Sequence, residues 1–450
     1  MARRRRRKLP QEPVSAKIES LSHEGRGIAR VEGKTVFVNG ALPGEDALFQ
    51  YKKQRPKYDE AHALEITNPA VERVEPKCEF FGLCGGCSLQ HMQHDKQIEH
   101  KQSVLMEQLG HIGKVKPKSV IPPLMGPVWG YRHKARLGVK YVEKKERVLV
   151  GFREKYSPFV ADMKSCEVLH PSVGTLIEPL QCLITELSLI KQIPQIEVAI
   201  GDEVTALIFR HLADFTDEDI RKLSAFAKHH NIDIYLQSGG LDSVVPLPGT
   251  TARQLSYALP EFDVMLNFLP TDFTQVNLEI NRAMVPRALE LLDVNSEDSV
   301  LDLFCGIGNF TLPLARKAAN VLGIEGEHGL VERAKQNAAF NNINNVEFQA
   351  IDLAKDDLNE DFSNIDFFRG GVNKLLLDPA RNGAQEVIEK MNLKSVERIV
   401  YVSCNPSTLA RDAGVLVNDK GFKLEQAGVM DMFPHTTHVE SIAVFSRKRK

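Results

Sequence analysis

The chain has 450 residues, of which 43% are hydrophobic and 26% are charged, as in a folded globular protein of several domains. This composition excludes wholesale disorder, collagen and a coiled coil, and no apolar run reaches the ~18 residues of a membrane span. The formal net charge is −2, yet residues 1–70 hold 14 Lys or Arg against 9 Asp or Glu. A basic N-terminal segment on an otherwise acidic chain favours a local contact between that segment and RNA or another acidic surface.

The N-terminus, residues 1–11, is a basic tail that contains Arg3 to Arg7. No apolar stretch follows it, so it is not a secretory signal, and we expect a cytoplasmic protein. The tail either solubilises the chain or binds nucleic acid.

In the cytoplasm the seven cysteines stay reduced, and clusters of them indicate metal sites or nucleophiles.

Residues 12–70 predict a small, five-stranded β-barrel. We expect short strands at Lys17–Ser20, Gly27–Val31, Lys34–Val38 and Asp46–Lys52, separated by glycine-containing turns. A barrel with basic and aromatic residues is a platform for single-stranded RNA; alternatively, the aromatic rings are core and the lysines are solvated. The residues concerned are Arg26, Arg30, Lys34, Lys52, Lys53, Arg55 and Lys57, with Phe37, Phe49 and Tyr51.

Residues 71–270 are interpreted as a central α+β domain that begins with a cysteine segment. Cys78, Cys84 and Cys87 are clustered, and Cys166 follows far downstream. Four thiolates suit an iron–sulfur cluster or zinc. The uneven spacing and the absence of a second C-x-x-C pair favour a 4Fe-4S cluster, with zinc or no metal as the alternatives. Cys182, in an apolar helical stretch at 176–189, is interpreted as a core residue.

Residues 271–450 alternate strand and helix, which predicts a doubly wound α/β domain with a mainly parallel sheet. Helices are expected at Leu330–Phe340 and Gln385–Met391. The expected strands are Val300–Phe304, Val321–Glu325, Val346–Ile351, Lys374–Leu377, Ile399–Ser403, Lys423–Met430 and Ser441–Phe445.

The first of these strands runs into a turn with Gly306 and Gly308, where backbone approaches a ligand. Thr311 replaces the third glycine of a dinucleotide fingerprint, which favours S-adenosylmethionine (SAM) over NAD. Glu325, which ends the second strand, would bind the ribose, and Asp352, at the end of the third, would lie near adenine. Asp378 closes the fourth strand at the same sheet edge. Cys305, in the turn, is interpreted as packing.

Cys404 ends a strand, and a helix starts near Pro406. A thiol facing a helix N-terminus is expected to have a lowered pKa. Attack of its thiolate on C6 of uracil would activate C5 for methylation, after which a base must remove the C5 proton. Glu440, before the last strand, is the candidate base. The alternative for Cys404 is a buried cysteine of the core. For Glu440, the alternatives are that it is a structural residue or that a histidine is the base.

Together these motifs resemble the RNA 5-methyluridine methyltransferases from about Lys17 to Phe445, and within them the type that methylates C5 of uracil 1939 in 23S rRNA. The resemblance implies a TRAM barrel, a central domain whose 4Fe-4S cluster is bound by Cys78, Cys84, Cys87 and Cys166, and a Rossmann-like class I SAM domain. It also implies a nucleophile, Cys404, and a base, Glu440. The implied SAM-binding residues are Gln275, Phe304, Asn309, Glu325, Asp352 and Asp378.

Related methyltransferases that act on tRNA lack the cluster and the barrel, and those that act on another rRNA uridine lack the barrel. Both are therefore weaker alternatives. A non-catalytic RNA-binding assembly factor and an NAD-linked redox protein are alternatives of other classes. The uridine must be flipped out or lie in an opened loop, and Arg132, Lys134 and Arg136 are candidate RNA contacts. We expect a monomer with no membrane or DNA partner.

Overall fold

The computed structural model describes residue 10, residues 12–353 and residues 371–447, so the predicted arginine tail, Arg3 to Arg7, lies outside the described residues. The chain divides into two compact units. The first comprises Met1–Lys101, Glu154–Ser157 and Pro434–Thr437; the second comprises Gln102–Arg153, Pro158–Phe433 and His438–Lys450. The predicted domain boundaries at residues 70 and 270 stay a prediction.

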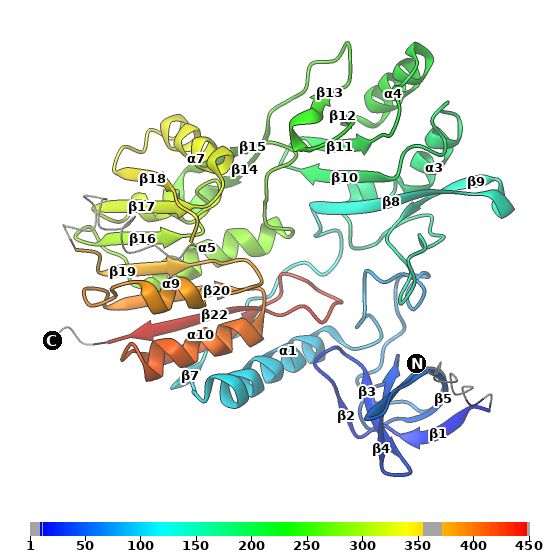
Figure 1. The fold of residues 1–450 in the computed structure, drawn as a ribbon, viewed down its shortest axis with the longest axis horizontal. Helices are drawn as coiled ribbons and strands as arrows, with labels where there is room; N and C mark the ends of the chain where they lie inside the picture. Colours follow the sequence, from blue (N-terminus) through cyan, green and yellow to red (C-terminus); the bar gives the residue numbers. More distant parts are fainter. Residues whose placement is uncertain (1–9, 11, 354–370, 448–450) are drawn as a thin grey trace, which may run out of the picture. The chain divides into compact units, whose positions relative to one another are not determined.

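The first unit begins with a six-stranded sheet (Figure 1) in the order β1-β5-β6-β4-β3-β2. Only Ile18 and Glu19 separate β1 from β2, the two edge strands of that order. The Glu19 N–H donates to the Ile28 carbonyl over 2.8 Å, so β1 and β2 act as one bent strand that closes a five-stranded barrel. The strands are β1 (Val14–Lys17), β2 (Ser20–Leu21), β3 (Gly27–Val31), β4 (Lys34–Asn39), β5 (Asp46–Gln54) and β6 (Tyr58–Asn68).

The barrel differs from the sequence prediction in two respects. Strand β6 was not among the predicted strands, because the buried Asp59 and the exposed Leu64 break the alternation of apolar and polar residues by which a strand is recognised. Phe49 and Tyr51 are buried core residues and contact each other edge to face. Of the three aromatic residues proposed to face RNA, Phe37 alone remains partly exposed.

Helix α1 (His94–Gln108) follows the cysteine segment and continues into a π-helical turn, η1 (Leu109–Gly113). The second unit then forms a six-stranded sheet in the order β13-β12-β11-β10-β8-β9. Cys182 is exposed on helix α3, so its interpretation as a core residue was wrong; Leu180, Leu183 and Ile184 form the buried face instead. The elements are β8 (Lys134–Val142), β9 (Arg147–Gly151), α2 (Pro171–Gly174), α3 (Ile177–Thr185), β10 (Gln195–Ile200), β11 (Thr205–Arg210), α4 (Asp217–His230), β12 (Asp233–Gln237), β13 (Val244–Pro246), and the short 3-10 turns η2 (Glu143–Lys145) and η3 (Leu241–Ser243).

The largest sheet has eight strands in the order β18-β17-β16-β19-β20-β22-β21-β7. Strands β18 to β20 pair in parallel, whereas β22 lies antiparallel between β20 and β21. This confirms the predicted doubly wound domain with a mainly parallel sheet (Figure 1). Its strands are β7 (Ser119–Val120), β16 (Ser299–Leu303), β17 (Asn320–Glu325), β18 (Val346–Ala350), β19 (Lys374–Leu377), β20 (Arg398–Ser403), β21 (Lys423–Met430) and β22 (Glu440–Ser446).

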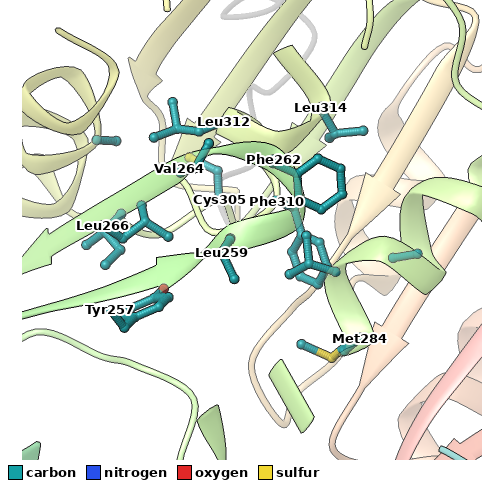
Figure 2. Close-up of a cluster of buried hydrophobic side chains, with 14 of the residues drawn as sticks. Tyr257, Leu259, Phe262, Val264, Leu266, Met284, Cys305, Phe310, Leu312 and Leu314 are labelled. Atoms are coloured by element: carbon teal, nitrogen blue, oxygen red, sulfur yellow. The ribbon is translucent and has the colours of Figure 1, made fainter. Parts of the chain in front are cut away.

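Alternate residues of these strands face two separate layers of helices. Val400 and Ile442 share a core cluster with Met284 of α5, whereas the neighbouring Tyr401 donates a hydrogen bond to Asp412 of α10. Figure 2 shows part of the core cluster of the first layer, to which Tyr257, Phe262, Phe310 and Cys305 all belong; the rings of Phe262 and Phe310 lie side by side. Cys305 is 4% exposed, which confirms its interpretation as a packing residue. The remaining elements are the hairpin β14 (Leu255–Leu259) and β15 (Val264–Phe268) with its turn η4 (Pro260–Phe262), and helices α5 (Leu278–Leu292), α6 (Thr311–Ala315), α7 (His328–Phe340), α9 (Gln385–Lys390) and α10 (Pro406–Asn418).

Among the described residues, no helix combines the length and the apolar composition that crossing a membrane requires.

The carboxylate of Asp412 fixes α10 to the sheet and to the loop before α9. The residue is fully buried and accepts hydrogen bonds from the Tyr401 hydroxyl (2.7 Å), the Ala384 N–H (2.7 Å) and the Arg411 Nε (2.8 Å). Because α10 begins two residues after Cys404, this network holds the backbone next to the thiol.

We predict that Asp412→Ala lowers the free energy of unfolding by about 3 kcal/mol, because it leaves buried donors without an acceptor. Urea denaturation measures this. Asp419→Ala, at the exposed C-terminal end of the same helix, is the control and should change stability by less than about 0.5 kcal/mol. Equal, small effects of both changes would contradict the anchoring role.

Candidate active site

The turn after β16 has the backbone of a ligand-binding loop. Phe304, Gly306 and Gly308 have φ values of 66°, 56° and 95°, in the region that favours glycine. The N–H groups of Phe304 and Cys305 both donate to the Ile324 carbonyl, over 2.8 and 3.1 Å. A Cβ added at Gly306 would meet no atom within 4 Å, so the backbone there faces open space.

Glu325 ends β17, as predicted, and its carboxylate ties the two loops together. It accepts hydrogen bonds from the N–H groups of Gly306 (3.1 Å), Gly326 (2.7 Å) and Glu327 (3.2 Å). Asp352 is exposed and lies two residues beyond the end of β18 at Ala350, not at the strand end as predicted. Both acids nevertheless follow consecutive parallel strands at the same edge.

The side chain of Asn309 holds the loop to its neighbours. Its amide exchanges two hydrogen bonds of 2.9 Å with Asn281 and accepts a third from the Tyr257 hydroxyl. Gln275 is half-buried in the segment between β15 and α5. Nearby, Asp272 accepts hydrogen bonds from the Leu269 N–H (2.7 Å) and the Arg333 Nε (2.8 Å), which fixes this segment.

The pairing of β20 with β22 brings Cys404 and Glu440 together. Ser403 pairs with Ser441 in the antiparallel register, so Cys404 and Glu440 are the next opposite residues. Opposite residues of an antiparallel pair point to the same face. Asp378 directly follows Leu377, which pairs in parallel with Tyr401, and thus reaches the same edge. The structure therefore gathers a thiol and two carboxyl groups that lie far apart in sequence.

These three groups have raised pKa values because they are enclosed. Burial, and then the neighbouring Asp378, raises the pKa of Glu440 well above its usual value, and the residue is 3% exposed. Burial raises the pKa of Asp378 to about 7. A carboxyl group with such a pKa accepts and releases a proton near neutral pH, as a general base must.

The predicted lowering of the Cys404 pKa was wrong. Burial, followed by the charges of Glu440 and Asp378, raises it to about 11, while the Arg381 guanidinium opposes this rise. The helix N-terminus does not face the thiol freely, because the Asn405 side chain already accepts the Ser407 N–H over 3.1 Å. The thiol is half-buried and requires help to ionise.

Comparison with known proteins identifies the chain. A family model described as tRNA (Uracil-5-)-methyltransferase matches residues 93–448. The chain belongs to this family. A TRAM domain model also matches residues 10–64, which overlap the barrel predicted at 12–70.

Curated relatives of the family match over almost their full length. The chain is 55% identical to the 23S rRNA (uracil(1939)-C(5))-methyltransferase RlmD of Nitrosococcus oceani, and 52% identical to that of Methylococcus capsulatus. Each alignment covers 99% of this chain and 99% of the relative. A Pyrococcus abyssi tRNA (uracil-54, C5)-methyltransferase in complex with S-adenosyl-L-homocysteine has the same fold, with a TM-score of 0.73 and 24% identity over 96% of this chain and 99% of that chain.

Asp302, to which the sequence gave no role, is a buried acid on the strand that leads into the glycine loop. It is fully buried on β16 and accepts a hydrogen bond from the Thr311 hydroxyl over 2.6 Å. Its Oδ1 has no hydrogen-bond partner among the described residues. Burial, with the nearby charges of Asp378 and Glu325, raises its pKa to about 8. An acid inside an otherwise apolar strand was the signal in the sequence.

The cysteine segment lies in the first unit, which contains Cys78, Cys84 and Cys87, whereas Cys166 belongs to the second unit. The Gly86 N–H donates to the Cys84 Sγ over 3.4 Å. Lys155 interacts electrostatically with Cys84 and Cys87, and its N–H donates to the Leu83 carbonyl over 2.8 Å. Within the described ranges, no group of three or more Cys, His, Asp or Glu residues has the geometry of a metal-ion site.

The three proposed RNA contacts of the central sheet are largely used within the protein. The Lys134 Nζ donates to the carbonyls of Pro270 (2.8 Å) and Asp272 (2.5 Å), and burial lowers its pKa to about 8. Arg136 forms an ion pair of 3.1 Å with Glu197. Arg132 donates to the Lys134 carbonyl over 3.0 Å. Lys134 is therefore a structural residue rather than an RNA contact.

We predict that Asp302→Asn removes a pH dependence of stability. Because the pKa of Asp302 is about 8 when folded and 3.8 when exposed, the folded state holds the extra proton between these values. Wild-type stability should therefore fall from about pH 4 to about pH 8 through this group.

Asparagine cannot ionise but can still accept the Thr311 hydrogen bond. Unfolding free energies of both proteins at about pH 5 and about pH 8 check this: the variant should gain on the wild type as the pH rises. Parallel pH profiles would contradict the burial of an ionisable group at this position.

Proposed function

We propose that this protein is a SAM-dependent RNA methyltransferase that converts uridine 1939 of 23S rRNA to 5-methyluridine. The observation that carries the proposal is the β20–β22 register, which sets Cys404 opposite Glu440 at the sheet edge that also carries the glycine loop. The position in rRNA follows from the names of the relatives that match the whole chain.

In the proposed reaction the Cys404 thiol loses its proton to solvent, its Sγ forms a bond to C6 of the uracil, and the electron pair of the C5–C6 double bond moves to C5 and O4. C5 then forms a bond to the methyl carbon of SAM while the bond from that carbon to the sulfonium sulfur breaks, and S-adenosyl-L-homocysteine leaves. Glu440 removes the C5 proton, the C5–C6 double bond re-forms, and the thiolate leaves.

The surroundings of these residues suit the proton transfers. The raised pKa of Glu440 makes it a proton acceptor of the strength that the C5 step needs. The Arg381 guanidinium is the positive charge that favours the Cys404 thiolate. The backbone carbonyl of Arg381 accepts a hydrogen bond from the Asn405 side chain over 3.0 Å, so the loop that carries Arg381 and the thiol are positioned together.

We infer that SAM lies against the loop after β16. The open backbone at Gly306 fits a ligand that approaches closely, and Glu325 stands beside it with a carboxylate suited to ribose hydroxyls. The proposed contacts are Gln275, Phe304, Asn309, Glu325, Asp352 and Asp378. Because the Asn309 side chain is held by Asn281 and Tyr257, we assign it to shaping the loop that presents the backbone.

We also propose a 4Fe-4S cluster bound by Cys78, Cys84, Cys87 and Cys166. An amide directed at Cys84 and an ammonium beside Cys84 and Cys87 are the surroundings that stabilise thiolate-bound clusters. One zinc ion draws its ligands to a single point, whereas a four-iron cluster spreads four thiolates over its corners. The lack of a single-ion site among the described residues is therefore compatible with a cluster.

The cellular setting and assembly state are part of the proposal. A cytoplasmic, monomeric enzyme with no membrane or DNA partner would meet its substrate during ribosome assembly. We propose this setting from the rRNA substrate named for the relatives.

We predict that Glu440→Gln accumulates a covalent RNA–protein adduct with an rRNA fragment that contains uridine 1939, because the base that allows release is lost. Denaturing gels should show it as a slowly migrating band that depends on SAM. Cys404→Ala is the matched control: it should bind SAM with unchanged affinity but form no adduct and transfer no methyl group.

Full methylation by Cys404→Ala would exclude the proposed nucleophile. Methylation of a tRNA fragment in preference to the rRNA fragment would keep the chemistry but change the substrate. RNA binding without methyl transfer by the wild type would indicate a non-catalytic assembly factor.

We predict that protein purified without oxygen is brown and contains iron and acid-labile sulfide. Cys84→Ser and Cys87→Ser should lose both, since each removes a cluster ligand, and should lower thermal stability. Cys182→Ser, at an exposed cysteine outside the segment, is the control and should retain the cluster. A colourless protein with stoichiometric zinc would contradict the iron–sulfur assignment.

A further inference from the structure

We propose that Lys134 is a positioning residue for SAM and that it acts through the segment 269–277, which carries Gln275. Lys134 does not touch the cofactor in this proposal; its ammonium group holds the backbone from which Gln275 projects. The inference rests on the proposed SAM site and adds to it a residue of a different sheet. All the residues concerned belong to the second unit.

Segment 269–277 joins strand β15 to helix α5 and lies outside the helices and strands. No ladder of a sheet and no turn of a helix fixes its backbone, so its position depends on other hydrogen bonds. Asp272 and Thr274 are buried, whereas Phe273 between them is 68% exposed, and Gln275 is half-buried. The segment therefore runs along the surface of the unit, where a loop moves unless specific contacts hold it.

Lys134 contacts the beginning of this segment. It is the first residue of β8, and its Nζ donates to the carbonyls of Pro270 over 2.8 Å and Asp272 over 2.5 Å. Hydrogen bonds from a charged donor are stronger than those between neutral groups. Burial lowers the pKa of Lys134 to about 8, as expected for an ammonium group that has exchanged water for these two carbonyls. One side chain thus fixes two backbone groups that lie two residues apart.

The two residues that precede β8 hold the other end of the segment. The His133 N–H donates to the Val276 carbonyl over 2.8 Å, and Arg132 forms an antiparallel bridge with Asn277. The start of the central sheet therefore contacts the segment on both sides of Gln275.

A further contact ties the segment to the other proposed SAM residues. The Asp272 carboxylate accepts hydrogen bonds from the Leu269 N–H over 2.7 Å and from the Arg333 Nε over 2.8 Å. Arg333 lies on α7, the helix that follows Glu325 at the end of β17. The same turn is thus held through its backbone by the central sheet and through its side chain by the helix after the proposed ribose-binding acid.

Stability alone does not require a lysine at this position. Removing an ammonium group from water costs free energy, and apolar groups of similar volume often stabilise a fold equally well. The ammonium group instead imposes one geometry on two carbonyls. Without it, we expect the fold to persist and the segment to sample several positions. SAM would then bind only the molecules in which Gln275 is correctly placed, and its apparent affinity falls with their fraction.

The first test measures SAM affinity of the full-length protein without RNA, by isothermal titration calorimetry. Lys134→Met should weaken SAM binding about ten-fold, as expected if about one tenth of the molecules hold the segment in the competent position. Lys134→Arg keeps a charged donor to the carbonyls and should bind SAM more tightly than Lys134→Met. Lys140→Met, at an exposed lysine of the same strand, is the matched control and should bind as the wild type does.

The second test is a double-mutant cycle, which asks whether Lys134 acts through Gln275. In a Gln275→Ala background, Lys134→Met should change SAM affinity by less than about two-fold, because the side chain to be positioned is absent.

Steady-state kinetics with the rRNA fragment separate positioning from a merely structural role. Lys134→Met should raise KM for SAM and leave kcat at saturating SAM and KM for RNA unchanged. A merely structural role would lower kcat, because fewer molecules would be folded, and would leave KM for SAM unchanged.

The proposal is overturned if Lys134→Met binds SAM with wild-type affinity. It is also overturned if Lys134→Met and Gln275→Ala weaken SAM binding independently, or if Lys134→Met lowers the melting temperature and kcat instead of the affinity. Failure of the proposed function is a different result: the wild type would then bind no SAM in the same titration.

Discussion

The antiparallel insertion of β22 between β20 and β21 is the constraint on which the catalytic half of the molecule depends. A parallel sheet ends all its strands at one edge, and that edge alone would carry the glycine loop, Asp378 and Cys404. The strand that follows must run in the opposite direction to begin there, and the Ser403–Ser441 register makes it do so. Glu440 is then the first residue of a strand whose neighbour, β20, ends one residue before Cys404, the proposed nucleophile.

This arrangement encloses three ionisable groups in a small space. Burial disfavours every charge among Cys404, Asp378 and Glu440, and each carboxylate further disfavours the thiolate. The site therefore holds its protons tightly, with one guanidinium, that of Arg381, acting in the opposite direction. A resting thiol of this kind is protected from oxidation and adventitious alkylation. In the proposed mechanism it becomes a nucleophile when substrate groups and a proton acceptor are in place.

In the barrel of the first unit, part of the basic and aromatic side chains are used within the protein. Of its eight Lys and Arg residues, three are engaged by acids, and two of its aromatic rings fill the core. Apart from Lys17, the cations that remain lie on the β5–β6 hairpin. Residues 154–157 belong to the same unit, where Lys155 interacts electrostatically with Cys84 and Cys87 and Tyr156 interacts with Arg26 and Glu60.

The sequence by itself determined the doubly wound domain, because apolar strands and amphipathic helices alternate there, and most of its strands agree with the prediction to within a residue. It also singled out Cys404 and Glu440, since a polar residue at the end of an apolar strand is a local signal. Tertiary structure alone decided what the neighbours of these residues are. The pKa of Cys404 rises, contrary to the sequence argument, because the thiol is partly buried and two carboxyl groups from distant strands add to this effect. Asn405 also caps the helix whose dipole was expected to act. Lys134 and Cys182 were misjudged for the same reason: whether a lysine meets carbonyls or solvent, and which side of a helix is covered, depends on elements that are remote in sequence.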